Sequence, residues 1–235
     1  MGDGDRGARR RRRLQQARLY VVTDAREQEG DLDRFLDAVL RGGADIIQLR
    51  EKDAEAAHLM RAGQHFKDAA RRHGALFIVN DRPDVALALD ADGVHLGQDD
   101  LTASVARRIL GPDAIIGIST HSPEQLEHAA VEADYLCAGP VYQTPTKPGR
   151  PPTGLDLIRV AASRVARGEE LRPWFAIGGL DAGTLADVVA AGATRAVVVR
   201  AVRGDDAHAA AAALRTLLGA ATHGEGSAPM AHAAS

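Results

Sequence analysis

Cysteine is almost absent from this sequence, as are the apolar segments that membrane insertion or secretion would require. The single cysteine, Cys137, cannot form an internal disulfide, so nothing in the chain of 235 residues requires an oxidising compartment. No apolar run reaches the roughly 18 residues of a membrane-spanning helix, and the first residues lack the apolar region of a secretory signal. These absences exclude a disulfide scaffold and a membrane protein, and they predict a cytoplasmic protein. Because 45% of the residues are apolar, the chain can bury a sizeable core.

Lysine is the second scarce residue, and arginine replaces it. Of the 29 basic residues only three are lysines, at positions 52, 67 and 147. Seven arginines and two aspartates give residues 1–18 a charge of +5, so the remainder carries −8. A block of like charge is typical of a solvated tail, and we predict a basic, disordered leader over residues 1–18. The run Arg9 to Arg13 leaves contact with nucleic acid open, but the negative remainder is not typical of a nucleic-acid-binding protein.

One pattern repeats between the two ends of the chain. A short run of apolar, often β-branched residues is followed by a polar turn and then by an Ala- and Leu-rich stretch. An Ala-Asp pair precedes several of the apolar runs, at residues 44–45, 91–92 and 133–134. The predicted strands are 19–23, 46–49, 76–79, 93–96, 115–118, 135–138, 174–177 and 196–199. The predicted helices are 32–41, 54–72, 83–89, 101–110, 123–132, 155–167, 181–191 and 205–218.

Eight such units in about 200 residues predict an α/β fold, a single-domain (β/α)8 TIM barrel over residues 19–219. Residues 220–235 are rich in Ala, Gly, Ser and His without periodicity, and we predict a disordered tail there. An open, doubly wound sheet is the alternative fold. Such a sheet usually has fewer strands and a glycine-rich first turn, whereas the first turn here is Asp24-Ala25-Arg26.

Two aspartates follow neighbouring predicted strands, at the end of the barrel where enzymes of this fold carry their active sites. Asp81 follows the third strand and Asp100 the fourth. Two carboxylates close together are costly unless a cation or a proton lies between them. Mg²⁺ suits such a pair, because it takes one or two carboxylates and completes its shell with water and phosphate oxygens. A helix cap or a surface ion pair is the alternative role for each aspartate.

Basic residues follow two other strands at the same end. Lys52 follows the second strand and Lys147 the sixth. A lysine in this position either contacts phosphate or forms a Schiff base. Arg50, two residues before Lys52, favours the phosphate role because a guanidinium binds phosphate through two parallel hydrogen bonds.

A second anion site is predicted beside the first. Gly178-Gly179 follows the seventh strand, where backbone amides often bind phosphate in this fold. Thr144 and Thr146 add hydroxyl donors from the loop after the sixth strand. A plain tight turn is the alternative explanation for the glycines. His121 ends the fifth strand and is the histidine best placed for acid–base chemistry.

The motifs at these strand ends resemble those of thiamine-phosphate synthases. The resemblance spans residues 19–202, and its motifs are QLREK at 48–52, ND at 80–81, HLGQDD at 95–100, GIS at 117–119, GPVYQTPTK at 139–147 and AIGG at 176–179. It implies a (β/α)8 transferase that joins 4-amino-5-hydroxymethyl-2-methylpyrimidine diphosphate to 4-methyl-5-(2-phosphooxyethyl)thiazole. The products would be thiamine monophosphate and pyrophosphate, formed through a pyrimidine cation that the thiazole nitrogen attacks.

The resemblance also implies roles for individual residues. Asp81 and Asp100 match the ligands of Mg²⁺. The residues that match contacts to the pyrimidine diphosphate are Gln48, Arg50, Lys52, Asn80, Ser119 and Lys147, of which Arg50, Lys52, Ser119 and Lys147 would take part in catalysis. The residues that match the thiazole phosphate site are Thr144, Thr146, Gly179, Val199 and Arg200. Arg200 departs from the family pattern, in which a serine commonly ends the eighth strand.

Other functions stay open at this point. A thiazole tautomerase-like isomerase on the same barrel would use a residue such as His121 and would need no Mg²⁺ site. A non-catalytic barrel could bind a phosphate ligand and contact nucleic acid through its basic leader. A Schiff-base aldolase through Lys147 is a third alternative. The expected partners are small-molecule substrates, with no nucleic acid and no membrane, and the sequence leaves a homo-oligomer open.

Overall fold

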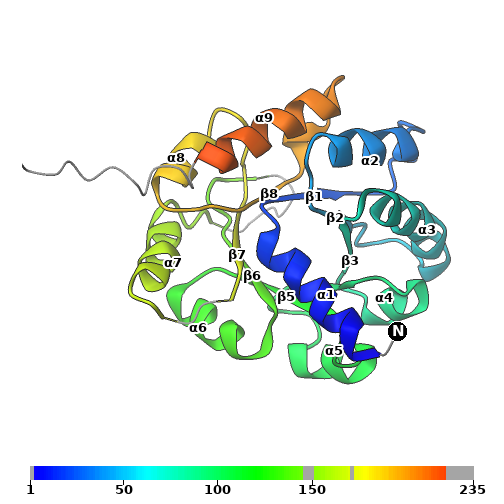
Figure 1. The fold of residues 1–235 in the computed structure, drawn as a ribbon, viewed down its shortest axis with the longest axis horizontal. Coiled ribbons are helices and arrows are strands. Elements are labelled where there is room, and N and C mark those ends of the chain that lie inside the picture. Colours follow the sequence, from blue (N-terminus) through cyan, green and yellow to red (C-terminus); the bar gives the residue numbers. More distant parts are fainter. Residues whose placement is uncertain (1–2, 145–150, 170–171, 221–235) are drawn as a thin grey trace, which may run out of the picture.

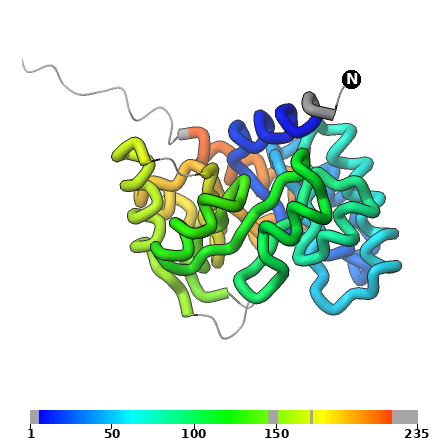
Figure 2. Tube along the Cα trace, turned by 90° about the horizontal axis from the view of Figure 1, so that it is seen from below, coloured from blue at the N-terminus to red at the C-terminus, as the bar shows by residue number. Residues whose placement is uncertain are grey.

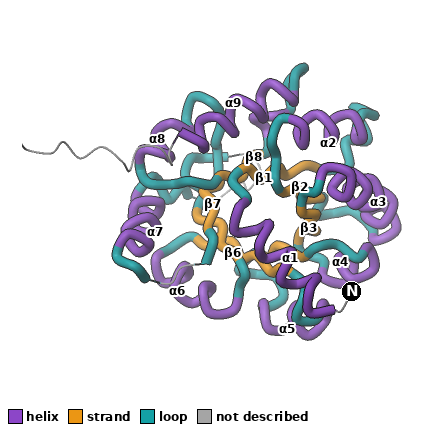
Figure 3. Tube along the Cα trace, in the orientation of Figure 1, coloured by secondary structure: helices purple, strands orange, loops and turns teal. Residues whose placement is uncertain are grey.

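The strands of this protein close into a barrel that its helices surround (Figures 1 and 3). The computed structural model describes residues 3–144, 151–169 and 172–220. All eight strands are parallel and pair in sequence order, and β1 (Leu19–Thr23) pairs with both β2 (Ile46–Leu49) and β8 (Ala196–Val198). This closure confirms the predicted (β/α)8 fold and excludes the open sheet.

The remaining elements alternate as the sequence predicts. The other strands are β3 (Leu76–Asn80), β4 (Gly93–Leu96), β5 (Ile115–Thr120), β6 (Tyr135–Ala138) and β7 (Trp174–Ile177). The helices that follow the strands are α2 (Leu32–Arg41), α3 (Ala56–His73), α4 (Pro83–Leu89), α5 (Ala103–Leu110), α6 (Pro123–Glu132), α7 (Asp156–Ala166), α8 (Leu185–Ala190) and α9 (Ala207–Ala220). A short 3₁₀ helix, η1 (Arg200–Val202), lies between β8 and α9.

A side-chain cap marks where α6 begins, whereas a similar turn before α8 does not mark the start of that helix. The side chain of Ser122 accepts a hydrogen bond from the N–H of Gln125 at 3.3 Å, so it caps α6. Asp181, which lies before α8, accepts the N–H of Thr184 at 3.0 Å. That bond closes a turn before the helix, and α8 begins later, at Leu185.

Alternate residues of a strand face the two layers of the core. In β1, Leu19 and Val21 pack in the layer between strands and helices, together with residues such as Phe35 of α2. Tyr20 and Val22 point into the barrel. Both sets are buried, which explains why the strands read as continuous apolar runs without polar alternation.

The repeated Ala-Asp pairs have one structural role. Asp92 accepts the N–H of Phe77 at 3.0 Å, and Asp134 accepts the N–H of Ile116 at 2.9 Å. Asp45 likewise accepts two backbone N–H groups at the start of β1, at 2.7 and 3.1 Å. Each aspartate therefore satisfies backbone donors where a neighbouring strand begins.

The predicted disordered leader is wrong for residues 3–16, which form helix α1 (Asp3–Gln16). The helix lies across the end of the barrel where the strands begin (Figures 1 and 2). Leu14 and, just after the helix, Ala17 are each only 1% exposed, and they pack against the side chains that fill the barrel. Burial of these apolar groups favours an ordered helix over a solvated tail.

The arginines of α1 pair with carboxylates of the barrel. Arg10 is 6% exposed, and its Nε lies 2.7 Å from Oδ1 of Asp92. The Nε of Arg11 lies 2.9 Å from Oδ1 of Asp134. Aspartates far along the chain thus neutralise part of the charge block that suggested a tail. Residues 221–235, which make up nearly all of the predicted tail, lie outside the described residues.

Within the described ranges, no helix combines the length and the apolar character needed to cross a bilayer.

Candidate active site

A cavity of about 280 Å³ is lined by residues at the ends of the strands and in the loops that follow them, whereas helix α1 lies where the strands begin. Its lining contains eight of the predicted substrate-binding residues, namely Gln48, Arg50, Asn80, Ser119, Thr144, Gly179, Val199 and Arg200. These residues come from strands or loops far apart in the sequence, and barrel closure brings them together. Two further predicted residues, Thr146 and Lys147, lie outside the described part of the chain.

Asp81 and Asp100 lie together at this end of the barrel. Asp81 directly follows β3 with a left-handed backbone (φ 58°), and its N–H donates to the carbonyl of His95 at 2.9 Å. Asp100 accepts the N–H of Gly97 through Oδ2 at 2.7 Å. Burial raises the pKa of the Asp81 carboxyl, and the hydrogen bond and charge of Asp100 raise it further. The two carboxyl groups therefore lie close enough for Asp100 to affect the ionisation of Asp81, and a metal site between them stays a prediction.

Lys52 partly offsets the repulsion between these acids. Its Nζ lies 3.4 Å from Oδ2 of Asp81 and lowers the pKa of that carboxyl. The lysine side chain is about half exposed, at 51%, so it can also reach a ligand at the mouth. A carboxyl pair flanked by one lysine has the charge distribution of a site that takes up a divalent cation bound to an anion.

The two carboxylates suit Mg²⁺, which can take its remaining ligands from water and phosphate, better than a metal whose ligands all come from the protein. Among the residues described, no group of three or more His, Cys, Asp or Glu side chains could hold a metal ion. Asp81 and Asp100 offer oxygen ligands only, which Mg²⁺ prefers, and leave coordination positions for water and phosphate oxygens. A tetrahedral zinc site would require further nitrogen or sulfur ligands from the protein.

Arg200 contributes positive charge on the opposite side of the mouth. It belongs to η1 and lines the cavity. Asp181 has a lowered pKa, chiefly because the N–H groups of Thr184 and Gly183 donate to it, with a smaller contribution from the Arg200 charge. Arg200 therefore lies close enough to Asp181 for its charge to act on that carboxylate, and its role towards a phosphate stays a prediction.

Gly178 and Gly179 are required by the packing of the loop after β6. Both have positive φ, at 106° and 68°. A Cβ on Gly178 would lie 2.5 Å from the Cα of Pro140, and one on Gly179 would lie 2.7 Å from the Cβ of Tyr142. The tight-turn explanation therefore accounts for both glycines, and anion binding by their amides stays a prediction.

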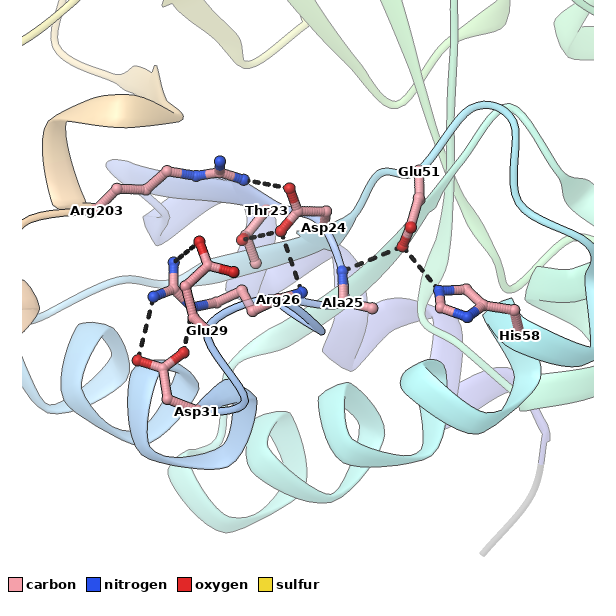
Figure 4. A network of polar contacts seen from close by, with 9 residues as sticks. All are labelled: Thr23, Asp24, Ala25, Arg26, Glu29, Asp31, Glu51, His58 and Arg203. Atoms are coloured by element: carbon pink, nitrogen blue, oxygen red, sulfur yellow. Dashed lines mark hydrogen bonds and ion pairs between the residues drawn. The ribbon is translucent and has the colours of Figure 1, made fainter.

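A polar network joins the loops beside the basic residues (Figure 4). Nη2 of Arg203, which follows η1, lies 2.6 Å from Oδ2 of Asp24 in the loop after β1. In the same loop the N–H of Ala25 donates to Glu51 at 3.3 Å. Oε2 of Glu51 lies 2.9 Å from Nε2 of His58 on α3. These contacts connect the loops after β8, β1 and β2, and Glu51 stands between Arg50 and Lys52 in the sequence.

A chain of buried polar side chains crosses the barrel below the cavity. The Nε2 group of Gln48 donates to the hydroxyl of Tyr20, which lies 2.9 Å from the hydroxyl of Tyr135. That hydroxyl lies 3.1 Å from Nδ1 of His95, and Nε2 of His95 lies 2.9 Å from Oγ of Ser119. The sequence predicts Gln48 and Ser119, at the two ends of this hydrogen-bonded chain, as site residues. It does not predict Tyr20 and Tyr135, because a tyrosine within an apolar strand resembles an ordinary core residue.

Comparisons with known proteins agree with this geometry. Residues 19–202 match the family model described as thiamine monophosphate synthase. A thiamine-phosphate synthase of Saccharopolyspora erythraea is 54% identical over 217 residues, covering 89% of this chain and 96% of that protein. One of Streptomyces avermitilis is 56% identical over 204 residues, covering 86% and 93%. The solved structure of thiamine phosphate pyrophosphorylase from Pyrococcus furiosus is 34% identical, with a TM-score of 0.77, covering 90% and 98%.

Proposed function

Because this chain belongs to the thiamine monophosphate synthase family, we propose that it is a transferase that joins a pyrimidine diphosphate to a thiazole phosphate. The substrates are 4-amino-5-hydroxymethyl-2-methylpyrimidine diphosphate and 4-methyl-5-(2-phosphooxyethyl)thiazole, and the products are thiamine monophosphate and pyrophosphate. The observation that carries the proposal is the interacting pair Asp81 and Asp100 beside Lys52, at the mouth of a cavity lined by Gln48 and Ser119.

Magnesium is part of the proposal. Asp81 and Asp100 would hold the ion, which would supply positive charge against the diphosphate. Lys52 and Arg50 lie on the loop after β2 and would bind the diphosphate oxygens, and we expect Lys147, which lies outside the described residues, to add a third cation. Their combined charge lowers the free energy of the departing pyrophosphate.

The reaction needs no nucleophile from the enzyme. Cleavage of the carbon–oxygen bond next to an electron-rich aminopyrimidine leaves a stabilised cation, and the ring nitrogen of the thiazole attacks its exocyclic carbon. The protein's contribution is then to hold both rings in line and to exclude water. Tyr20, Val22 and Ile177 line the cavity and supply apolar surface for the rings.

The direct test combines both precursors with the purified chain and measures pyrophosphate and thiamine monophosphate. We expect turnover with Mg²⁺ and none with a chelator. Asp81→Ala and Lys147→Ala should each lower kcat/KM by roughly a hundredfold or more, because Asp81 would hold the magnesium ion and Lys147 would supply positive charge to the leaving group. Lys67→Ala is the matched control, since that lysine is on α3 and contacts only Asp90 among the acids described, at 3.9 Å.

The same assay distinguishes the alternatives. An isomerase would convert the thiazole alone, a ligand-binding barrel would bind without releasing pyrophosphate, and an aldolase would be trapped by borohydride on Lys147. No structural observation favours these functions over the synthase. We further propose that the protein works in the cytoplasm on small molecules, and a homo-oligomer stays a prediction.

A further inference from the structure

We infer that two carboxylates outside the cavity, Asp24 and Glu51, are positioning residues that hold the two predicted anion sites in place separately. Glu51 sets the loop that carries Arg50 and Lys52 to the pyrimidine diphosphate. Asp24 sets helix η1, which carries Arg200 to the thiazole phosphate. This inference rests on the proposed function, because it assigns each carboxylate to one of the two substrates.

The loop after β1, residues 24–31, is the support that the two sites share. It lies between the loop after β2 and η1, because β1 pairs with both β2 and β8. Among the described residues, none of positions 24–31 lines the cavity, whereas Arg50 and Arg200 on its two sides do. Glu51 does not line it either. Each carboxylate therefore acts on a ligand in the cavity through the groups that it holds.

Arg26 fixes this loop to helix α2. Its side chain is 5% exposed and donates two hydrogen bonds to the Asp31 carboxylate, at 2.6 and 3.1 Å. Its Cζ lies 4.2 Å from the centroid of the Phe35 ring on α2. Its backbone has a left-handed conformation (φ 49°), which a residue other than glycine keeps only where surrounding contacts hold it. The loop is therefore firmly held and can support its neighbours.

The loop after β2 is tied to this support by two hydrogen bonds and to α3 by a third. The N–H of Arg50 donates to the carbonyl of Thr23 at 2.8 Å. Oε2 of Glu51 accepts the N–H of Ala25 at 3.3 Å and lies 2.9 Å from Nε2 of His58. Figure 4 shows the Glu51 carboxylate pointing toward both groups. Because Glu51 stands between the two cations of this loop, these contacts fix the backbone from which both cations extend.

The segment after β8 is tied to the same support by Asp24. Its Oδ2 lies 2.6 Å from Nη2 of Arg203, and its Oδ1 accepts the N–H of Arg26 at 3.1 Å. The N–H of Arg203 in turn donates to the carbonyl of Arg200 at 3.0 Å, which closes η1. The side chains of Arg203 and Asp24 are 33% and 38% exposed, and an ion pair this exposed contributes little to the stability of the whole fold. Its effect is therefore local, on the orientation of η1 and of Arg200.

The two ties are separate in their atoms although they share one loop. Asp24 holds η1 through its side chain, whereas Glu51 is held by the backbone N–H of Ala25 and by α3. Arg26 keeps the loop in place when either carboxylate is removed. Loss of Glu51 should thus weaken binding of the pyrimidine diphosphate, and loss of Asp24 binding of the thiazole phosphate. A carboxylate that serves only the fold would affect both substrates alike.

The test measures KM for each substrate with the other saturating, on the purified full chain with Mg²⁺. The ratio of the two KM values is the readout, because kcat is common to both substrates. We expect Glu51→Ala to raise KM for the pyrimidine diphosphate by roughly fivefold to tenfold and to leave the other KM within about twofold. Asp24→Ala should give the reverse pattern, with KM raised for the thiazole phosphate.

Conservative variants separate position from folding. Glu51→Gln and Asp24→Asn keep a carbonyl oxygen that can accept the same backbone N–H groups. Each should therefore return KM most of the way from the alanine variant to the wild type. These variants also carry the test where an alanine variant does not fold.

A double-mutant cycle tests the contact between Asp24 and Arg203. Arg203→Ala should raise KM for the thiazole phosphate as much as Asp24→Ala does, and the double variant should be no worse than either single variant. If Arg203 instead binds the phosphate itself, its removal would raise KM further in the Asp24→Ala background. That additive result would overturn the positioning role of Asp24.

Glu29→Ala is the matched control. Glu29 lies on the same loop, is 41% exposed and faces Nη1 of Arg26 at 3.9 Å. Its removal should leave both KM values unchanged. Folded Asp24 and Glu51 variants that keep the wild-type KM ratio would overturn the inference, whether both KM values stay constant or rise together. A wild-type chain that makes no thiamine monophosphate would instead contradict the proposed function.

Discussion

The Asp81 carboxyl is held where its ionisation is opposed. Burial raises its pKa from the ordinary value of 3.8, and Asp100 raises it again through a hydrogen bond and through charge. Residues of this kind are common at functional sites, where the cost of a like-charge pair is recovered when a ligand binds. Lys52 alone does not cancel the cost, since the net shift is still upward.

A pH experiment tests this single residue. Because the pKa of Asp81 is higher in the folded than in the unfolded chain, the wild-type protein loses stability as pH rises through that interval. Asp81→Asn removes this loss. In the presence of a chelator, the free energy of unfolding of the variant should therefore exceed that of the wild type by an amount that grows from pH 4 to pH 7, measured by urea denaturation.

Asp84→Asn is the control, because Arg82 lowers the pKa of Asp84 through a hydrogen bond. Removal of the Asp84 carboxylate should lower the free energy of unfolding at neutral pH, which is the opposite of the effect expected for Asp81→Asn. An Asp81→Asn difference that does not vary with pH would contradict the coupling between the two carboxyls.

At the scale of an element, helix α1 shows how a charge block becomes part of a fold. One face of the helix buries Leu14 and Arg10, while Arg9 and Arg13 are exposed. Arg10 also donates to the carbonyl of Ala91 at 2.9 Å, so its guanidinium is satisfied as it is buried. The helix therefore closes the barrel at the end opposite the cavity.

Substitutions in α1 should change stability in a pattern that depends on the face. Leu14→Ala should cost about 2–4 kcal/mol, because it leaves a cavity in a packed interior. Arg10→Ala should cost about 1–3 kcal/mol, because it leaves the Asp92 carboxylate without this partner. Arg9→Ala, on the exposed face, should stay within about 0.5 kcal/mol of the wild type. Equal effects at positions 9 and 10 in urea denaturation would contradict the docking of the helix.

At the scale of the whole molecule, the two ends of the barrel have separate roles. Where the strands begin, the Asp134 carboxylate accepts hydrogen bonds from the side chain of Arg11, from the side chain of Arg107 at 2.6 Å and from the backbone N–H of Ile116. Where the strands end, ion pairs such as Arg203–Asp24 stand beside one unfavourable pair, Asp81 and Asp100, that Lys52 only partly offsets. This division is general in barrels of this type, in which one end serves stability and the other carries the chemistry.

One pair of variants tests the division. Asp134→Asn should lower the free energy of unfolding by about 1–3 kcal/mol, since its side chain is only 13% exposed and has charged partners. Its kcat should match that of the wild type. Lys52→Met should do the reverse, lowering kcat/KM by roughly tenfold or more with little change in stability. A large loss of activity in Asp134→Asn at temperatures where it is folded would contradict the separation.

The sequence alone predicts most of the barrel and the composition of its mouth. The eight strands are short apolar runs whose neighbours along the chain are also their neighbours in space, so local patterns suffice to locate them. Because parallel strands of a closed barrel all end on one side, any polar residue that follows a strand can be assigned to the mouth. Asp81, Asp100 and Lys52 were found in this way.

What the tertiary structure decided depends on residues that are far apart in the chain. The hydroxyls of Tyr20 and Tyr135 are separated by 115 positions, and Arg10 and Asp92 by 82. Neither residue of such a pair carries a local sign of its partner, since a tyrosine in a strand resembles core and an arginine in a charged run resembles solvent-exposed tail. Only closure of the barrel brings these groups within hydrogen-bonding distance, and burial there makes the pairing favourable.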